Sequence, residues 1–327
     1  MATRIPFDQS FWKDYLAGQE AHLPPLPDVE DLTDRVVRIL GGNPGPMSLQ
    51  GTNTYLIGTG RSRILIDTGE GLPCWIERIA LLLDQRQIEL SHILLTHWHG
   101  DHTGGVPDLV AYKGELATRV YKNQPDRGQN DIADGQVFRV EGATIRAVST
   151  PGHAVDHMCF LLEEENALFT GDNVLGHGYS VVLDLSPYMH SLARMAALEC
   201  IVGYPAHGAR IEDLPAKMRD YIRNRESRVQ QVFSTLLRSG SMPAGGRERP
   251  RGRSGMTLAE IVQSIYGDVP THVVEKALAP FLAQVLWKLA EDRKVGFEPG
   301  DLTKRRWFVS QTHPRTRPPL GRPHTAV

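Results

Sequence analysis

The chain has 327 residues, of which 41% are hydrophobic and 23% are charged, and its formal net charge is −2. This length favours one large domain with a smaller one attached, and the near-neutral charge argues against a strongly basic, dedicated nucleic-acid binder. No window approaches the roughly 18 consecutive apolar residues of a membrane span, and the three cysteines form no C-x-x-C pair that would indicate a thiolate metal site.

Residues 1–34 combine a short aromatic patch with the proline-rich stretch LPPLPDVEDL. We expect this segment to be an amino-terminal arm lying on the main domain. It contains no apolar core of the kind found in secretory signal peptides. We therefore expect a cytoplasmic protein with no membrane contact.

Residues 35–238 are predicted to form the catalytic domain. Short β-branched and aliphatic runs occur in two batches, and most of them end in or are followed by glycine, aspartate or histidine. The first batch is RVVRIL, NTYLIG, RILIDTG and HILLTH; the second is QVFRV, ATIRAVST, HMCFLLE and ALFTGD. The stretch PCWIERIALLLDQ and residues 187–199 and 215–237 read as helices. This order predicts an α/β (α+β) fold, with sheets covered by helices.

The carboxyl-terminal part is predicted to hold a second, smaller unit. Residues 239–256 are rich in glycine, proline and arginine, which indicates a flexible basic linker. Residues 257–310 open with a potential capping box, Thr257 and Glu260, continue as a helix over 270–291, and end in the β-wing-like KVGFEPGDLTKRRWFVS. They indicate a small helical, winged-helix-like unit, and residues 311–327 are expected to be a disordered tail.

The motif THWHGDH concentrates potential metal ligands in one loop. His97, His99, Asp101 and His102 lie within six residues, directly after an apolar run. Imidazole and carboxylate groups suit zinc, and also iron or manganese. Burying so many polar groups for packing alone is costly, so metal binding is the better explanation.

Three further candidates follow apolar runs later in the chain, as a two-metal site would require. His153 lies in STPGHAVDH, Asp172 in ALFTGDNVLG and His207 in GYPAHGARI, each beside glycine or proline. They have the same strand-end setting as the first motif. We therefore expect all of these side chains to converge on one metal centre.

The H-x-H-x-D-H motif and the order of the three later residues resemble those of the metallo-β-lactamase superfamily of hydrolases, over about residues 35–215. The resemblance implies an αββα sandwich and two divalent metal ions, with zinc favoured and manganese as the alternative. It assigns His97, His99 and His153 to the first metal; Asp101, His102 and His207 to the second; and Asp172 to the bridge between them.

Two other residues are candidates for orienting the metal ligands without being assigned to a metal themselves. Asp67, in ILIDTG, matches the early aspartate of the family and would orient a ligand; the alternative is a carboxylate that only stabilises a strand-end turn. His157, in PGHAVDH, is either a similar supporting group or a hydrogen-bonded structural residue.

Two divalent ions about 3.5–4 Å apart lower the pKa of bound water from about 15.7 towards 7 and so supply a nucleophile at neutral pH. The site is therefore expected to be hydrolytic. Asp101 would act as proton donor and acceptor, orienting the nucleophile or moving its proton. The ligand motif itself does not select the bond that is cleaved.

Resemblance outside the motif suggests the substrate. RVVRILGGNPGPMSLQGTNTYLIGTG and EGATIRAVSTPGH resemble the subgroup that contains the β-lactamase-like protein 2 endoribonucleases. The arm RIPFDQSFWKDYLAGQEAHLPPLP instead resembles the stand-alone thioesterases of fungal polyketide clusters. Such enzymes release atrochrysone carboxylic acid or related chains from the acyl carrier domain of a non-reducing polyketide synthase.

We favour the thioesterase, with that acyl carrier domain as its partner. Two other activities stay open at this point. One is a metal-dependent endoribonuclease acting on single-stranded RNA, the only alternative in which nucleic acid is a partner. The other is a glyoxalase-II-like hydrolase of small thioesters.

Overall fold

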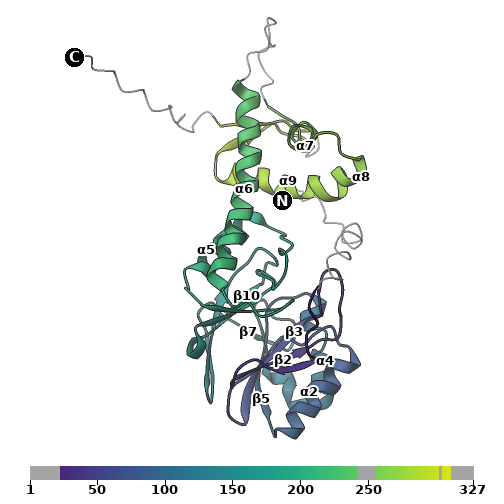
Figure 1. The fold of residues 1–327 in the computed structure, drawn as a ribbon, viewed down its shortest axis with the longest axis vertical. Helices are drawn as coiled ribbons and strands as arrows, with labels where there is room; N and C mark the ends of the chain where they lie inside the picture. Colours follow the sequence, from purple (N-terminus) through teal and green to yellow (C-terminus); the bar gives the residue numbers. More distant parts are fainter. Residues whose placement is uncertain (1–22, 242–254, 302–303, 311–327) are drawn as a thin grey trace, which may run out of the picture. The chain divides into compact units, whose positions relative to one another are not determined.

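The computed structural model describes residues 23–241, 255–301 and 304–310. The described residues divide into two compact units, one ending at Glu226 and the other beginning at Ser227 (Figure 1). Residues 29–31 of the predicted arm form an edge strand, and the rest of its described part is irregular. Most of the predicted linker and the predicted tail lie outside the described residues.

The first unit contains a seven-stranded sheet in which every strand pairs with its neighbour in the sequence. The strands are β1 (Val29–Asp31), β2 (Val36–Leu40), β3 (Asn53–Ile57), β4 (Ser62–Ile66), β5 (Glu89–Leu95), β6 (Val120–Lys122) and β7 (Asn130–Asp131). Pairing is antiparallel from β1 to β4 and parallel from β4 to β7. A helix between β4 and β5 provides the crossover that a parallel pair needs.

A five-stranded sheet lies against the first and has the order β12-β11-β10-β9-β8. Its strands are β8 (Val137–Val140), β9 (Ala143–Ser149), β10 (Met158–Leu162), β11 (Ala167–Gly171) and β12 (Val202–Pro205). The pairs are antiparallel except for β11 with β12, which is parallel.

Alternating side chains explain why the two sheets stack. In β4, Ile64 and Ile66 belong to the core that also contains Phe160 and Phe169 of the second sheet, whereas Leu65 points to the opposite face. There it packs in a second core with Trp75 and Ile79 of the helix α2. Because successive side chains of a strand face opposite sides, one run of apolar residues is buried in two cores.

Helices cover the outer faces of both sheets (Figure 1). On the first sheet lie α2 (Pro73–Gln85) and α4 (Val106–Tyr112), with the short α3 (Gly100–Thr103) before α4 and the 3-10 helix η1 (Gly114–Arg119) after it; on the second sheet lie α5 (Leu185–Ala196) and the first part of α6 (Leu214–Ser241). A short 3-10 turn, η2 (Glu163–Glu165), joins β10 to β11. The predicted sandwich with helices on its faces is confirmed.

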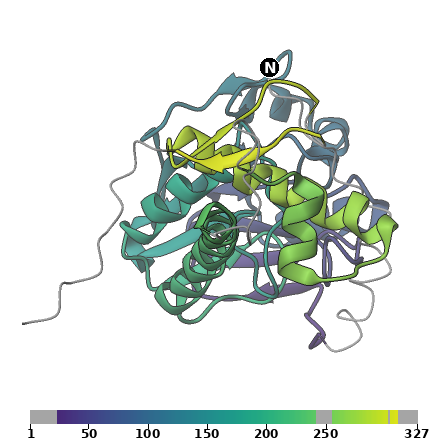
Figure 2. The same cartoon turned by 90° about the horizontal axis from the view of Figure 1, so that it is seen from above.

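The second unit continues α6 and adds further helices and a two-stranded antiparallel sheet (Figure 2, yellow). The elements are α7 (Leu258–Tyr266), α8 (Thr271–Val273), the π-helical segment η3 (Val274–Leu278), α9 (Ala279–Glu291), β13 (Val295–Phe297) and β14 (Trp307–Val309). Thr257 and Glu260 form the predicted capping box at the start of α7. Within the described residues, no helix combines the length and apolarity needed to cross a bilayer.

Candidate metal centre

The candidate ligands lie at the carboxyl ends of strands, as their sequence setting predicted. Asp67 follows β4 and His97 follows β5, two strands that run in parallel. Asp172 and His207 follow β11 and β12, the parallel pair of the second sheet. Parallel strands end at the same edge of a sheet, so four separate segments of the chain meet there.

The first group of side chains joins the metal-motif loop to the loop between β9 and β10. His97, His99, His153 and Asp172 each offer one ligand atom, and within the group these atoms all lie within 4.8 Å of one another. The Nδ1 atom of His99 is 2.8 Å from Nε2 of His97 and 3.0 Å from Nε2 of His153. Three imidazole nitrogens thus point at one small volume.

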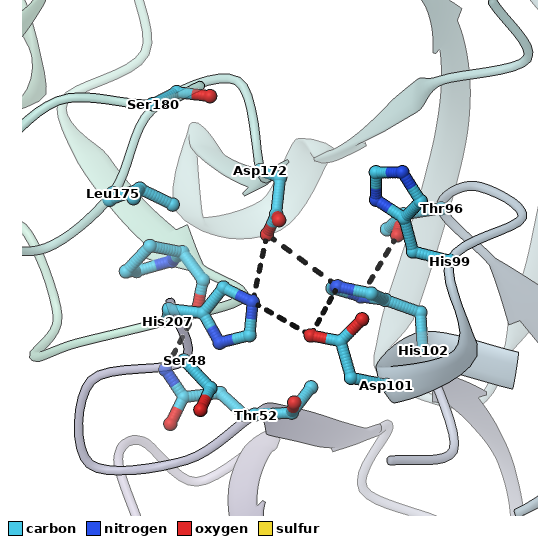
Figure 3. Close-up of polar contacts among 12 residues, drawn as sticks. Ser48, Thr52, Thr96, His99, Asp101, His102, Asp172, Leu175, Ser180 and His207 are labelled. Carbon is cyan, nitrogen blue, oxygen red and sulfur yellow. Dashed lines mark hydrogen bonds and ion pairs between the residues drawn. The ribbon is translucent and has the colours of Figure 1, made fainter. Parts of the chain in front are cut away.

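The second group consists of Asp101, His102 and His207. The short helix α3 carries both Asp101 and His102. The Oδ2 atom of Asp101 lies 3.4 Å from Nε2 of His102 and 3.3 Å from Nε2 of His207. Figure 3 shows the three side chains pointing towards one another.

Asp172 lies between the two groups and presents one oxygen to each. Its Oδ2 is 3.4 Å from Nε2 of His153. Its Oδ1 is 3.2 Å from Nε2 of His207 and 3.6 Å from Nε2 of His102 (Figure 3). A carboxylate in this position has the geometry of a bridge.

The donor set fits cations better than it fits an internal hydrogen-bond network. The buried Nε2 of His102 and Oδ1 of Asp172 have no hydrogen-bond partner. Leaving such groups unpaired costs about 1–3 kcal/mol each, and more when they are charged. Imidazole and carboxylate donors around two adjacent points are the ligands that divalent transition metals prefer. The cluster is therefore able to bind metal.

The two groups differ in electrostatics. Burial lowers the pKa of His99 to about 4, and burial also lowers the pKa of His97 and His153. His207 is equally buried, but the carboxylates of Asp172 and Asp101 outweigh this effect and raise its pKa to about 10. Without metal, the imidazoles of the first group are therefore neutral at pH 7, whereas the second group holds protonated imidazole.

Asp67 and His157 both contact candidate ligands. The Oδ2 atom of Asp67 is 2.8 Å from Nδ1 of His102, and its Oδ1 accepts a hydrogen bond of 2.8 Å from the backbone N–H of Thr96. His157 accepts a hydrogen bond of 3.1 Å at Nε2 from the backbone N–H of Asp172. One side chain thus fixes the ring of His102, and the other fixes the backbone of Asp172.

Gly105 allows the segment after the motif to lie against the sheet edge. A Cβ atom at Gly105 would be 2.1 Å from the carbonyl oxygen of Thr68 and 2.5 Å from the ring of Trp75. Neither neighbour can move easily, because one is backbone and the other is a fully buried ring. The absence of a side chain therefore lets the loop that carries the ligands pack closely on the residues after β4.

The sequence interpretation missed two kinds of supporting residue. Thr96 directly precedes His97 and contacts both Asp67 and Nδ1 of His97 through its hydroxyl; its place beside the motif was a usable signal. Nδ1 of His153 lies 2.8 Å from the carbonyl oxygen of Val181 and 3.3 Å from Oγ of Ser180. No local pattern marks these two residues, because the contact spans 28 and 27 positions of the chain.

A model of the metallo-beta-lactamase superfamily matches residues 47–207, a stretch that carries all seven candidate ligands and ends at His207. The lactamase-like protein aptB of Emericella nidulans is 67% identical over 96% of this chain and 100% of its own length. The chain belongs to the metallo-beta-lactamase superfamily. It is thus a member of a family of metal-dependent hydrolases.

Other members of the superfamily extend the comparison. The lactamase-like protein nscB of Aspergillus fumigatus is 62% identical over 100% of this chain and 99% of its own length. Among solved structures, a beta-lactamase domain protein from Burkholderia ambifaria has a TM-score of 0.66 at 18% identity, covering 89% of this chain and 98% of that one. A metallo-beta-lactamase family protein from Thermus thermophilus has a TM-score of 0.57 at 23% identity, covering 85% and 99%. The two structures support the fold.

Proposed function

We propose that this hydrolase is a thioesterase that cleaves the bond between a polyketide and the acyl carrier domain of a non-reducing polyketide synthase. The observation that carries the proposal is the apolar character of the loops around the metal centre. The centre itself fits hydrolysis in general, so the choice of substrate depends on what surrounds it.

Five exposed apolar side chains, which we call the apolar rim, belong to loops that carry or contact the candidate ligands. They are Met47, Trp98, Val155, Tyr179 and Leu183. Trp98, with 53% of its surface exposed, lies between two candidate ligands in the sequence, and its ring centroid is 4.4 Å from that of His99. Val155 is 68% exposed and lies two residues after His153.

The remaining rim residues approach from the other loops. Tyr179 flanks Ser180, which contacts His153, and the backbone N–H of Leu183 bonds to the carbonyl of Gly152 beside the same ligand. Met47 lies in the loop that leads to Thr52, which bridges to His207. Contiguous exposed apolar surface marks binding sites, and we take the apolar rim to form one. It suits an apolar acyl chain better than the phosphates of RNA, for which basic side chains are expected.

The residues fit two divalent ions, zinc first and manganese as the alternative, with Asp172 shared between the two groups. Such ions would supply an activated water and Lewis-acid stabilisation of the developing negative charge. Asp101 is the more exposed carboxylate of the cluster. Interactions with His102 and His207 outweigh the effect of its burial and lower its pKa, so it is ionised at neutral pH and, as a hydrogen-bond acceptor, would orient the attacking water.

A thioester needs little acid assistance to be cleaved. Its thiolate leaving group has a reference pKa of about 8.5, so that it departs with little protonation, whereas a ribose oxygen is a far stronger base. The chain's task would be to orient the thioester and the attacking water.

The proposal is tested by incubating the purified protein with a synthase that lacks a releasing domain and with malonyl-CoA. The polyketide acid should appear only when the protein is added, and Asp101→Asn should slow its release by at least about 100-fold. Equal release by Asp101→Asn would refute the assigned role of Asp101. Cleavage of single-stranded RNA, or of small glutathione thioesters, without release of a polyketide would replace the proposal by one of its two alternatives.

A further inference from the structure

The segment of residues 174–184, which follows the bridging Asp172, orients one of the proposed ligands. It reaches His153 through the carbonyl oxygen of Val181, 2.8 Å from Nδ1 of the ring, and through Oγ of Ser180 at 3.3 Å. A histidine that binds metal through Nε2 needs a partner at Nδ1 that fixes its tautomer and its direction. The position of this segment therefore decides where Nε2 of His153 points.

Helix α6 holds the 174–184 segment by side chains one turn apart. The guanidinium of Arg225 donates a hydrogen bond of 2.7 Å from Nη2 to the carbonyl oxygen of Ser180. The hydroxyl of Tyr221 accepts a bond of 3.0 Å from the backbone N–H of Leu175 and donates one of 2.9 Å to the carbonyl oxygen of Gly178. Residues four apart share one face of a helix, so a single face of α6 is attached at three backbone positions.

Arg225 is one of several buried cationic side chains among the described residues. Only 9% of its surface is exposed, and its guanidinium carbon lies 5.5 Å from the ring centroid of Tyr188. Its Nε atom has no hydrogen-bond partner. Burying a charge with so few partners is costly, and an apolar residue would fill the same space without that cost. What an apolar residue would not provide is the bond to Ser180.

We propose that Arg225 is a positioning residue for the metal centre, which holds the carbonyl of Ser180 so that Val181 and Ser180 fix the imidazole of His153. The inference rests on the proposed metal centre and adds to it a residue that lies outside the ligand loops, on α6. Its effect passes through backbone, so it depends on the guanidinium reaching Ser180 and not on charge near the metals.

The test compares zinc affinity, measured by competition with a chromophoric chelator, for the wild type, Arg225→Met and Arg223→Met. Met keeps the apolar stem of Arg225 but removes the donor, and Arg223 is an exposed residue of the same helix that serves as the matched control. We expect Arg225→Met to bind zinc about tenfold more weakly, in the range found for residues that orient ligands, and Arg223→Met to bind as the wild type does.

A double-mutant cycle separates positioning from a general loss of structure. In a His153→Ala background, Arg225→Met should have little further effect on zinc affinity, because the ring that it positions is absent. An equal loss in both backgrounds, or wild-type affinity of Arg225→Met, would overturn the inference. If Arg225→Met does not fold, Tyr221→Phe, which removes the neighbouring attachment, is measured in the same cycle with the same criteria. A wild-type protein that binds no zinc would instead refute the proposed metal centre.

Discussion

At the residue scale, the seven candidate ligands include one histidine whose pKa is lowered to about 4, His99, and one whose pKa is raised to about 10, His207. All seven side chains converge at one edge of the sandwich, since each follows a strand and the strands end there. Thr96 could have been found, because it adjoins the motif. Ser180, Val181 and Arg225 could not, because they act through backbone contacts between segments distant in the sequence, and such contacts leave no periodic or spaced pattern.

The unequal pKa values predict that metal binding releases protons from one group only. His207, with its pKa raised to about 10, is protonated at pH 8 in the metal-free protein, whereas His99, with a pKa of about 4, is neutral. A ligating imidazole must be neutral, so the affinity of the second group should rise with pH until about 10, and that of the first should change little near neutrality.

Calorimetric titration with zinc at pH 8, in two buffers of different ionisation enthalpy, measures this release. We expect heats that depend on the buffer, and a smaller dependence for His207→Ala. Heats independent of the buffer would show that zinc binding releases no proton from the second group, which would contradict the prediction.

Asp67 offers a second prediction at this scale. Asp67→Asn keeps the size of the side chain but leaves one acceptor where two are used, one for Thr96 and one for His102. The side-chain NH2 group of the asparagine must then lie against one of these two donors, which removes one hydrogen bond. We therefore expect zinc affinity to fall about 10–100-fold. Glu70→Ala, at an exposed position of the same loop, is the control. Unchanged affinity of Asp67→Asn in the chelator competition would argue against its orienting role.

At the element scale, most strands and helices could be predicted from the spacing of apolar residues and from the glycine, proline and polar residues that separate the runs. The strand runs stand out because the first sheet buries apolar residues on both of its faces. The helix predicted over 215–237 is α6, Leu214–Ser241. The helix predicted over 270–291 is interrupted by the π-helical segment Val274–Leu278, which composition does not reveal. Part of the predicted arm is β1, which a three-residue run was too short to indicate.

The close packing of the segment after the motif gives a prediction for Gly105. Gly105→Ala would place its Cβ against the carbonyl oxygen of Thr68 and the ring of Trp75, and such overpacking costs about 1–3 kcal/mol. Gly114→Ala is the control, since a Cβ there meets nothing within 4 Å. Urea unfolding should show a lower free energy of unfolding for the first variant only; equal stability of both would mean that the segment shifts without cost.

At the scale of the whole molecule, family membership follows from sequence and fold together, while the substrate does not. The candidate ligands could be predicted because metal binding restricts the residue types that can serve. The apolar rim could not, because its members come from separate loops and none is marked as exposed by its neighbours in the sequence. Only the fold determines which of these side chains are exposed.

Metal removal should weaken the fold as well as abolish activity. A ligand that binds only the native state adds about 2.7 kcal/mol at a hundred times its Kd, which for a chain of this size corresponds to a melting temperature higher by on the order of 5 °C. Calorimetric scans with excess zinc and with a chelator should differ by this amount, and less in Asp172→Ala. Identical scans would indicate that no metal is bound to the native protein.

The central claim is that the metal-loaded protein hydrolyses an acyl thioester on a carrier domain. Intact-mass measurement of an acyl-loaded carrier domain tests it most directly, since the acyl group and the carrier are weighed before and after incubation. The account predicts that the carrier loses the mass of the acyl group and keeps its phosphopantetheine, and that chelation prevents the loss. A carrier that stays fully loaded beside metal-replete protein would contradict the account.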